Sequence, residues 1–298
     1  IYTHESPLGG LMNCAFEKVY KNANDNGIRV LLDGTGLDEA FGGYRIHHLI
    51  YLHKIYKSNN HLFKKHVQDY SNKWEINTED VMMQLKKLSF NDNFVQDGSS
   101  FNQINYTTKE FQSHNINSFQ KNINAKDNIQ SHLIDYILRS KIPKNTRIKD
   151  RQSMSHSIEL RMPFLDHRII ELGLSLDEKY YFDKGFTKSI VRSIMKNKLP
   201  DKVRLGQKRS IQAPQSAFLK NSKTAEYILD LISSESFKKR EIFDANNIKK
   251  NYKHFLKYGA KNTFHIWQWI NVEKFFQIFV DNKLKIYSLK KYFEIINL

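Results

Sequence analysis

The sequence predicts an α/β fold, in which a partial, Rossmann-like parallel sheet core is joined to a large, mainly helical carboxyl-terminal part. Three observations predict it. A helical pattern ends at the turn signal Asn26-Gly27, and a short apolar run, 28–32, follows. A glycine-rich loop and a new helical pattern come directly after that run, as in a piece of a doubly wound domain. Helical spacing then dominates the chain as far as Leu298.

The first helix is expected over 11–26, because small and apolar residues recur at helical spacing from Leu11 to Ala23. This pattern puts Cys14 on the apolar side, where a small core residue is a better interpretation than a catalytic thiol. The run 28–32 is apolar without alternation. Such a run is typical of a strand buried on both faces of a parallel sheet.

The helical pattern resumes at Asp38 and extends to about Tyr70. Residues 91–127 are poor in aliphatic side chains and predict a surface excursion with short helical pieces. Asp127 is expected to cap a helix that Pro143 ends. Further helices are expected at 187–197, which is amphipathic, and at 264–279, which is strongly aromatic.

We expect residues 1–220 to form one domain and residues 221–298 to be its helical extension. One convincing parallel strand is too few for an independent sheet. The chain begins at Ile1 without a recognisable leader. We therefore expect this chain to be the carboxyl-terminal piece of a longer protein.

Composition limits the class of protein. The hydrophobic fraction of 40% predicts a folded chain, and no apolar run is long enough to span a bilayer. One cysteine excludes an internal disulfide and suits a reducing cytoplasm. The net charge of +16 would suit a nucleic-acid binder, but the lysines are spread along the whole chain. A basic helical nucleic-acid-binding protein therefore remains the alternative from another class, and we consider it less favoured.

The segment from Asp33 to Tyr44 carries the chemistry. Gly34 and Gly36 follow the expected strand, where glycine lets a ligand approach the backbone. Asp38 and Glu39 open the next helix, whose amide groups favour phosphate. Two acids beside a phosphate would suit Mg²⁺, but they would equally complement the helix dipole. The residues alone leave these two interpretations even.

Three blocks in order resemble the synthetase domain of the asparagine synthetases. Residues 33–44, DGTGLDEAFGGY, resemble that family's Ser-Gly-x-Gly-x-Asp-Glu-x-Phe-x-Gly-Tyr motif. Residues 150–168, DRQSMSHSIELRMPFLDHR, resemble its DRxSMxxSxExRxPFLDxR block. Lys208, with Pro214 six residues on, resembles its KxGFxxP segment. The resemblance covers roughly residues 1–220 and implies a fold of the adenine-nucleotide α-hydrolase type.

The resemblance implies an ATP-dependent carbon–nitrogen ligase that uses glutamine as its amide donor. A side-chain carboxylate, in that family aspartate, forms an acyl-adenylate, and ammonia then displaces AMP to give asparagine. Among the residues, Asp33, Gly34 and Gly36 would lie against ATP. Asp38 would bind Mg²⁺, Glu39 would support it in catalysis, and Lys208 would meet the pyrophosphate and the charge that grows in the transition state.

The chain also departs from the family. The upstream Ser-Gly-Gly-x-Asp-Ser pyrophosphate loop and the glutaminase domain are absent from the 298 residues, so we expect the piece alone to be inactive. Thr35 stands where the family usually carries an acid that aids amide formation, and Asp33 replaces a serine. These changes favour, as an alternative, a relative that amidates another carboxylate, for example in a surface polysaccharide or a specialised metabolite. The acceptor and the oligomeric state stay open, a homodimer included.

Other polar residues favour structural roles. Glu159 and Arg161 are expected in a buried ion-pair network, and Asp166 is expected to cap the next helix. The histidines His47, His48 and His53 do not have the spacing of a helical metal pair. A packed or solvated helix face is the better interpretation.

Overall fold

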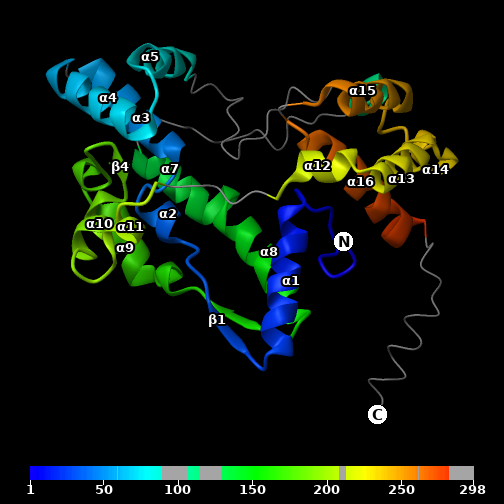
Figure 1. The fold of residues 1–298 in the computed structure, drawn as a ribbon, viewed down its shortest axis with the longest axis horizontal. Coiled ribbons are helices and arrows are strands. Elements are labelled where there is room, and N and C mark those ends of the chain that lie inside the picture. The colour runs from blue at the N-terminus through cyan, green and yellow to red at the C-terminus, as the bar shows by residue number, and fades with distance from the viewer. Residues whose placement is uncertain (59, 89–105, 114–128, 208–212, 261, 282–298) are drawn as a thin grey trace.

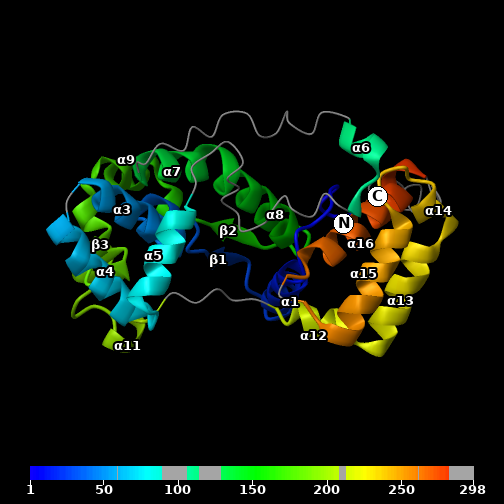
Figure 2. The same ribbon diagram turned by 90° about the horizontal axis from the view of Figure 1, so that it is seen from above.

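The computed structural model describes residues 1–58, 60–88, 106–113, 129–207, 213–260 and 262–281. Two helical groups lie at opposite ends, and helices α1 (Met12–Asp25) and α8 (Ile142–Met154) lie between them with the strands β1 (Val30–Leu32) and β2 (Glu159–Arg161) (Figures 1 and 2). None of the described helices is both long enough and apolar enough to cross a membrane.

The first helical group surrounds a core that extends from Leu49 to Phe182. Its elements are α2 (Leu37–Ala40), α3 (Arg45–Ser58), α4 (Asn60–Trp74), α5 (Thr78–Lys87), α7 (Ile129–Asp135), the π-helical turn Tyr136–Ser140, α9 (His167–Ser175), the 3-10 turns Pro163–Leu165 and Glu178–Tyr180, the hairpin β3 (Phe182–Asp183) and β4 (Phe186–Thr187), α10 (Ser189–Ile194) and α11 (Asp201–Arg204). The core side chains come from the four helices α3, α4, α5 and α7 and from Tyr181 and Phe182 at the start of the hairpin, so this group is held by helix packing rather than by a sheet.

The second helical group has a separate core, from Leu219 to Trp269. Its elements are α6 (Lys109–Ser113), α12 (Gln215–Lys220), α13 (Ser222–Ser233), α14 (Glu235–Lys238), α15 (Ala245–Tyr258), α16 (Phe264–Phe275) and the π-helical turn Phe276–Val280. The predicted helix 264–279 is found as α16 with its π-turn, whereas the predicted helix 187–197 is shorter, as α10, because Thr187 belongs to β4. The predicted domain limit at residue 220 stays a prediction.

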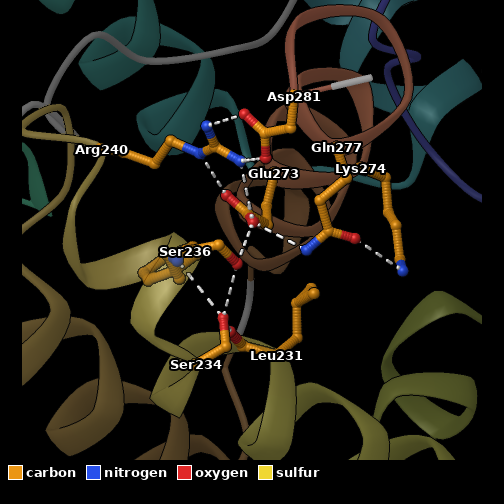
Figure 3. A network of polar contacts seen from close by, with 9 residues as sticks. Leu231, Ser234, Ser236, Arg240, Glu273, Lys274, Gln277 and Asp281 are labelled. Carbon is orange, nitrogen blue, oxygen red and sulfur yellow. Dashed lines mark hydrogen bonds and ion pairs between the residues drawn. The ribbon is translucent and has the colours of Figure 1, made fainter. Parts of the chain in front are cut away.

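A buried ion-pair network ties the end of this second group together (Figure 3). Arg240 donates to the carboxylate of Glu273 at 2.8 Å and to that of Asp281 at 2.7 Å. The Glu273 side chain is fully buried, and it also accepts from Ser236 and Gln277. Because a buried carboxylate must be paired, this network fixes α16 against the turn after α14.

The sheet confirms a mixed α/β fold, although most of the described chain is helical. β1 and β2 are parallel, with Val30 opposite Glu159 and Leu32 opposite Arg161. Leu31 packs with Tyr20 and Ile158 beneath α1. A full Rossmann-like core stays a prediction, because these two strands form the described parallel sheet.

Three details of the sequence prediction were wrong. The strand is not buried on both faces: Val30 is 40% and Leu32 is 77% exposed, because α1 covers one face and, in the part of the chain that the structure describes, no element covers the other. Cys14 is exposed instead of in the core. β2 is a second parallel strand, where the sequence showed one. The helix expected to end at Pro143 does end before it, at Ser140, and Pro143 itself lies in the first turn of α8, where its missing N–H costs nothing. The predicted cap Asp127 lies outside the described residues.

Candidate functional site

The candidate site lies where β1 ends. The amide of Asp33 donates to the carbonyl of Arg161 at 2.9 Å, so the pairing with β2 continues one residue past the strand. The loop 33–36 follows, and α2 begins at Leu37. This is the carboxyl edge of the parallel pair, which is the edge where open α/β sheets bind ligands.

A lysine from α8 closes the loop. The Lys149 ammonium lies 3.0 and 2.8 Å from the two carboxylate oxygens of Asp33, and 2.7 Å from Oγ1 of Thr35. Asp33 also accepts from the amide and the hydroxyl of Thr35. Burial by itself would raise the pKa of Asp33, but the hydrogen bonds from Lys149 and Thr35 together outweigh it and lower that pKa. Asp33 is therefore an ionised carboxylate that Lys149 holds in place.

The two loop glycines have different roles. A Cβ on Gly34 would meet no atom of the described residues within 4 Å, so that part of the chain leaves the backbone open there. A Cβ on Gly36 would lie 2.6 Å from Leu165 and 2.8 Å from the carbonyl of Phe164, and its φ of +103° is one that side chains rarely allow. Gly34 thus leaves room for a ligand such as a nucleotide, whereas Gly36 is needed to pack the loop on the turn Pro163–Leu165.

Asp38 forms an ion pair with Lys188, and both side chains are largely buried. Lys188 has a left-handed backbone, φ +54°, just before α10. The described residues contain no group of three or more side chains that could hold a metal ion. Lys188 occupies one oxygen of Asp38 in this arrangement, so the predicted binding of Mg²⁺ by Asp38 stays a prediction, and we derive no step through a metal.

Glu39 points into the protein. It is 2% exposed, and its oxygens accept from the amide of Gly36 at 3.2 Å and from the hydroxyl of Tyr44 at 2.5 Å. Burial and the neighbouring Glu39 raise the pKa of Tyr44, so Tyr44 stays a neutral donor. These contacts make Glu39 a cap of α2. Its predicted support of catalysis would therefore consist of holding the loop in place through the amide of Gly36.

The second family block has structural contacts. Glu159 and Arg161 pair at 2.9 Å but are 57% and 61% exposed, so the expectation of a buried network was wrong for this pair. The reason is that both residues lie on the uncovered face of the short β2. Asp166 caps α9 by accepting from the amide of Arg168, as predicted. Arg151 forms an ion pair with Glu5 at 2.8 Å.

The histidines of α3 form a packed face, as predicted for His47 and His48. Both are fully buried. Burial lowers the pKa of each to about 3, so both are neutral at pH 7. His48 stacks on Phe182 with 4.6 Å between ring centres.

The sequence prediction missed two lysines and named one that cannot be placed. Lys208 lies outside the described residues. Lys149 is 116 residues away from its partner Asp33 along the chain. Lys188 is 150 residues away from its partner Asp38. No local spacing could have shown these contacts, although Lys149 stands next to the Asp150-Arg151 block and a sequence reading could have extended the block by one residue.

Comparisons with known proteins agree with the three sequence blocks. The family model described as asparagine synthase matches residues 1–277. No curated protein and no solved structure matches the chain.

Proposed function

The chain belongs to the asparagine synthase family, and from this premise we propose that it takes part in ATP-dependent amide formation on a carboxylate, with aspartate as the first candidate acceptor. Family membership supports a ligase or amidotransferase that uses ATP. The acceptor, the ammonia source and the residue roles are our proposals.

The proposed reaction has two steps. A carboxylate oxygen of the acceptor bonds to the α-phosphorus of ATP, the bond from that phosphorus to the bridging oxygen breaks, and pyrophosphate leaves. Ammonia then bonds to the acyl carbon, the bond to AMP breaks, and a proton is lost from nitrogen. A carboxylate oxygen is a poor leaving group, and adenylation makes it a good one. We propose that glutamine supplies the ammonia through a glutaminase unit outside these 298 residues.

One observation carries the proposal: the glycine loop at the carboxyl edge of the sheet combines an open backbone at Gly34 with two fixed pairs of charges. Lys149 holds Asp33 and Lys188 holds Asp38. Negative charge moves onto pyrophosphate during adenylation, and ammonium groups held in place stabilise such charge without reorganisation. Mg²⁺ would supply further charge neutralisation when bound with ATP. In the proposal Lys208 adds another cation.

A second candidate acceptor class, a carboxylate other than aspartate, is favoured by Thr35. Its hydroxyl contacts Asp33 and Lys149, and a hydroxyl is not a general base at neutral pH without help. If position 35 normally aids attack by ammonia, this chain must achieve that step differently. The same loop would then suit a different acceptor.

The test is pyrophosphate release from MgATP by the protein expressed from its complete gene. Aspartate is supplied with ammonia or glutamine, and Asp38→Ala is the control variant. Release that needs aspartate and is lost in the variant supports asparagine formation. Pyrophosphate release with another carboxylate, but not with aspartate, would show that the acceptor belongs to the second class, the carboxylates other than aspartate. No release with any carboxylate would refute the proposed function.

A further inference from the structure

A cavity of about 760 Å³ lies apart from the glycine loop, on another side of α8. Three parts of the chain enclose it: residues 6–9, the first half of α8, and the second helical group. Figure 2 shows the amino-terminal end beside α16, and the amide of Leu8 donates to Oδ1 of Asn271 there. The volume falls within the range of about 300–1,000 Å³ that is usual for small-molecule sites.

The wall of the cavity is apolar and aromatic. Tyr106, Phe111, Trp269 and Phe276 contribute rings to it. Tyr106 and Trp269 lie edge to face, with 5.2 Å between ring centres, so these rings form one fixed surface. An aromatic or aliphatic body suits this wall.

The charge of the lining has one sign. Lys144 and Arg147 line the cavity from α8, and the described lining contains no Asp or Glu. Arg147 donates to Oγ of Ser6 at 3.1 Å and to the carbonyl of His4 at 3.0 Å, which are neutral acceptors that do not cancel its charge. Arg147 therefore offers its positive charge to an anion at the apolar wall, and Lys144 lines the cavity one turn before it.

We infer that this cavity binds a small organic acid, with an aromatic or aliphatic body against the rings and one acidic group at Arg147, on the side of the cavity that Lys144 also lines. Ile148 lines the cavity, whereas its neighbour Lys149 contacts Asp33 in the loop. The bound acid therefore lies against the same turn of α8 from which Lys149 reaches the loop. The inference does not need the proposed function. The acid is either the acceptor of the reaction or a separate ligand.

The probe is 8-anilinonaphthalene-1-sulfonate, which has an aromatic body and one anionic group. Its fluorescence is excited by energy transfer from tryptophan, without ATP in the solution. 4-Phenylbutyrate and its neutral amide then compete with it. We expect saturable binding at one site, with displacement by the acid at least about tenfold better than by the amide, as a charge held at an apolar wall would give.

Two variants locate the binding. A Cβ on Gly9 would meet no atom of the described residues within 4 Å, so Gly9→Phe places a ring at the wall, and Gly9→Ala is its control. We expect Gly9→Phe to weaken probe binding about tenfold or more through a steric clash. We expect Lys144→Met to weaken it about two- to fivefold, and Lys253→Met on α15 to leave it unchanged. Circular dichroism confirms that each variant is folded.

The inference is overturned if probe binding does not saturate, if the amide competes as well as the acid, or if neither Gly9→Phe nor Lys144→Met weakens binding. Displacement by ATP, but not by 4-phenylbutyrate, would make this a nucleotide site and would overturn it as well. Pyrophosphate release supported by 4-phenylbutyrate would identify the bound acid as the acceptor. Probe binding that passes these tests while no carboxylate supports release would leave the acid site standing and refute only the proposed function.

Discussion

Removal of the Lys149 ammonium should destabilise the protein by about 2 kcal/mol at pH 7. At 2.8 Å and an effective dielectric constant of 20, its attraction to Asp33 is roughly 6 kcal/mol before desolvation. The two side chains are 20% and 19% exposed. Loss of one partner costs about 3–5 kcal/mol in a fully buried pair and at most about 1 kcal/mol in an exposed pair, so an intermediate value follows.

The assay is thermal unfolding of Lys149→Met, with an expected fall in Tm of about 4–8 °C. The control is Lys21→Met, which breaks the Lys21–Asp25 pair at 2.8 Å, where both side chains are more than half exposed. We expect the control to cost less than about 1 kcal/mol. In an Asp33→Asn background, Lys149→Met should cost clearly less than in the native protein, because the charge that it balances is gone.

The stability that the Lys149–Asp33 pair contributes should depend on pH, and the pKa of Asp33 gives the direction of that dependence. The folded protein lowers the pKa of Asp33, so the stability from this pair is present above the unfolded pKa of about 3.9 and is lost as the pH falls through the folded value. The difference in Tm between the native protein and Lys149→Met should therefore shrink below about pH 4. Equal stability of the two proteins at pH 7, or a difference that persists unchanged at low pH, would refute the reasoning.

Four further predictions concern single sites. Gly36→Ala should destabilise by about 2–3 kcal/mol, because its Cβ would lie 2.6 Å from a neighbouring side chain at a φ of +103°. Gly34→Ala should leave Tm nearly unchanged and raise the KM for ATP, and equal Tm losses in the two would contradict the model of the loop. Arg240→Met should cost about 3–5 kcal/mol in urea unfolding, against less than about 0.5 kcal/mol for Lys238→Met in an exposed pair. Since burial lowers the pKa of His48 to about 3, the unfolded chain binds the extra proton below pH 6.5, and stability should fall by about 1.4 kcal/mol per pH unit for this histidine. His48→Phe should remove that part of the slope between pH 6.5 and 5, and an unchanged slope would show that His48 is not the group responsible.

Much of the local structure could be predicted from the sequence, because its causes are local. Helical spacing predicted α1 and α16, and the Asp166 cap followed from the residues next to it. The family blocks also located the glycine loop at the end of β1, since they are contiguous in the chain. These signals depend on neighbours within a few residues, which the sequence displays directly.

The chemistry of the loop was decided by the tertiary structure. The sequence showed that Asp33, Asp38 and Glu39 are acids, but not which cation or donor each would meet. Lys149, from another helix, neutralises Asp33, and Lys188 takes Asp38, while Glu39 turns inward to cap α2. A carboxylate's role depends on charges and burial in three dimensions, and those come from segments more than 100 residues away.

The sequence by itself therefore determined the family, the helices α1 and α16, the strand β1 and the place of the glycine loop. The tertiary structure decided which face of β1 is covered, which loop glycine faces open space, and which lysine holds each acid. The physical reason is that residue type and periodicity are properties of neighbours along the chain. Burial, packing and electrostatic pairing are instead properties of neighbours in space.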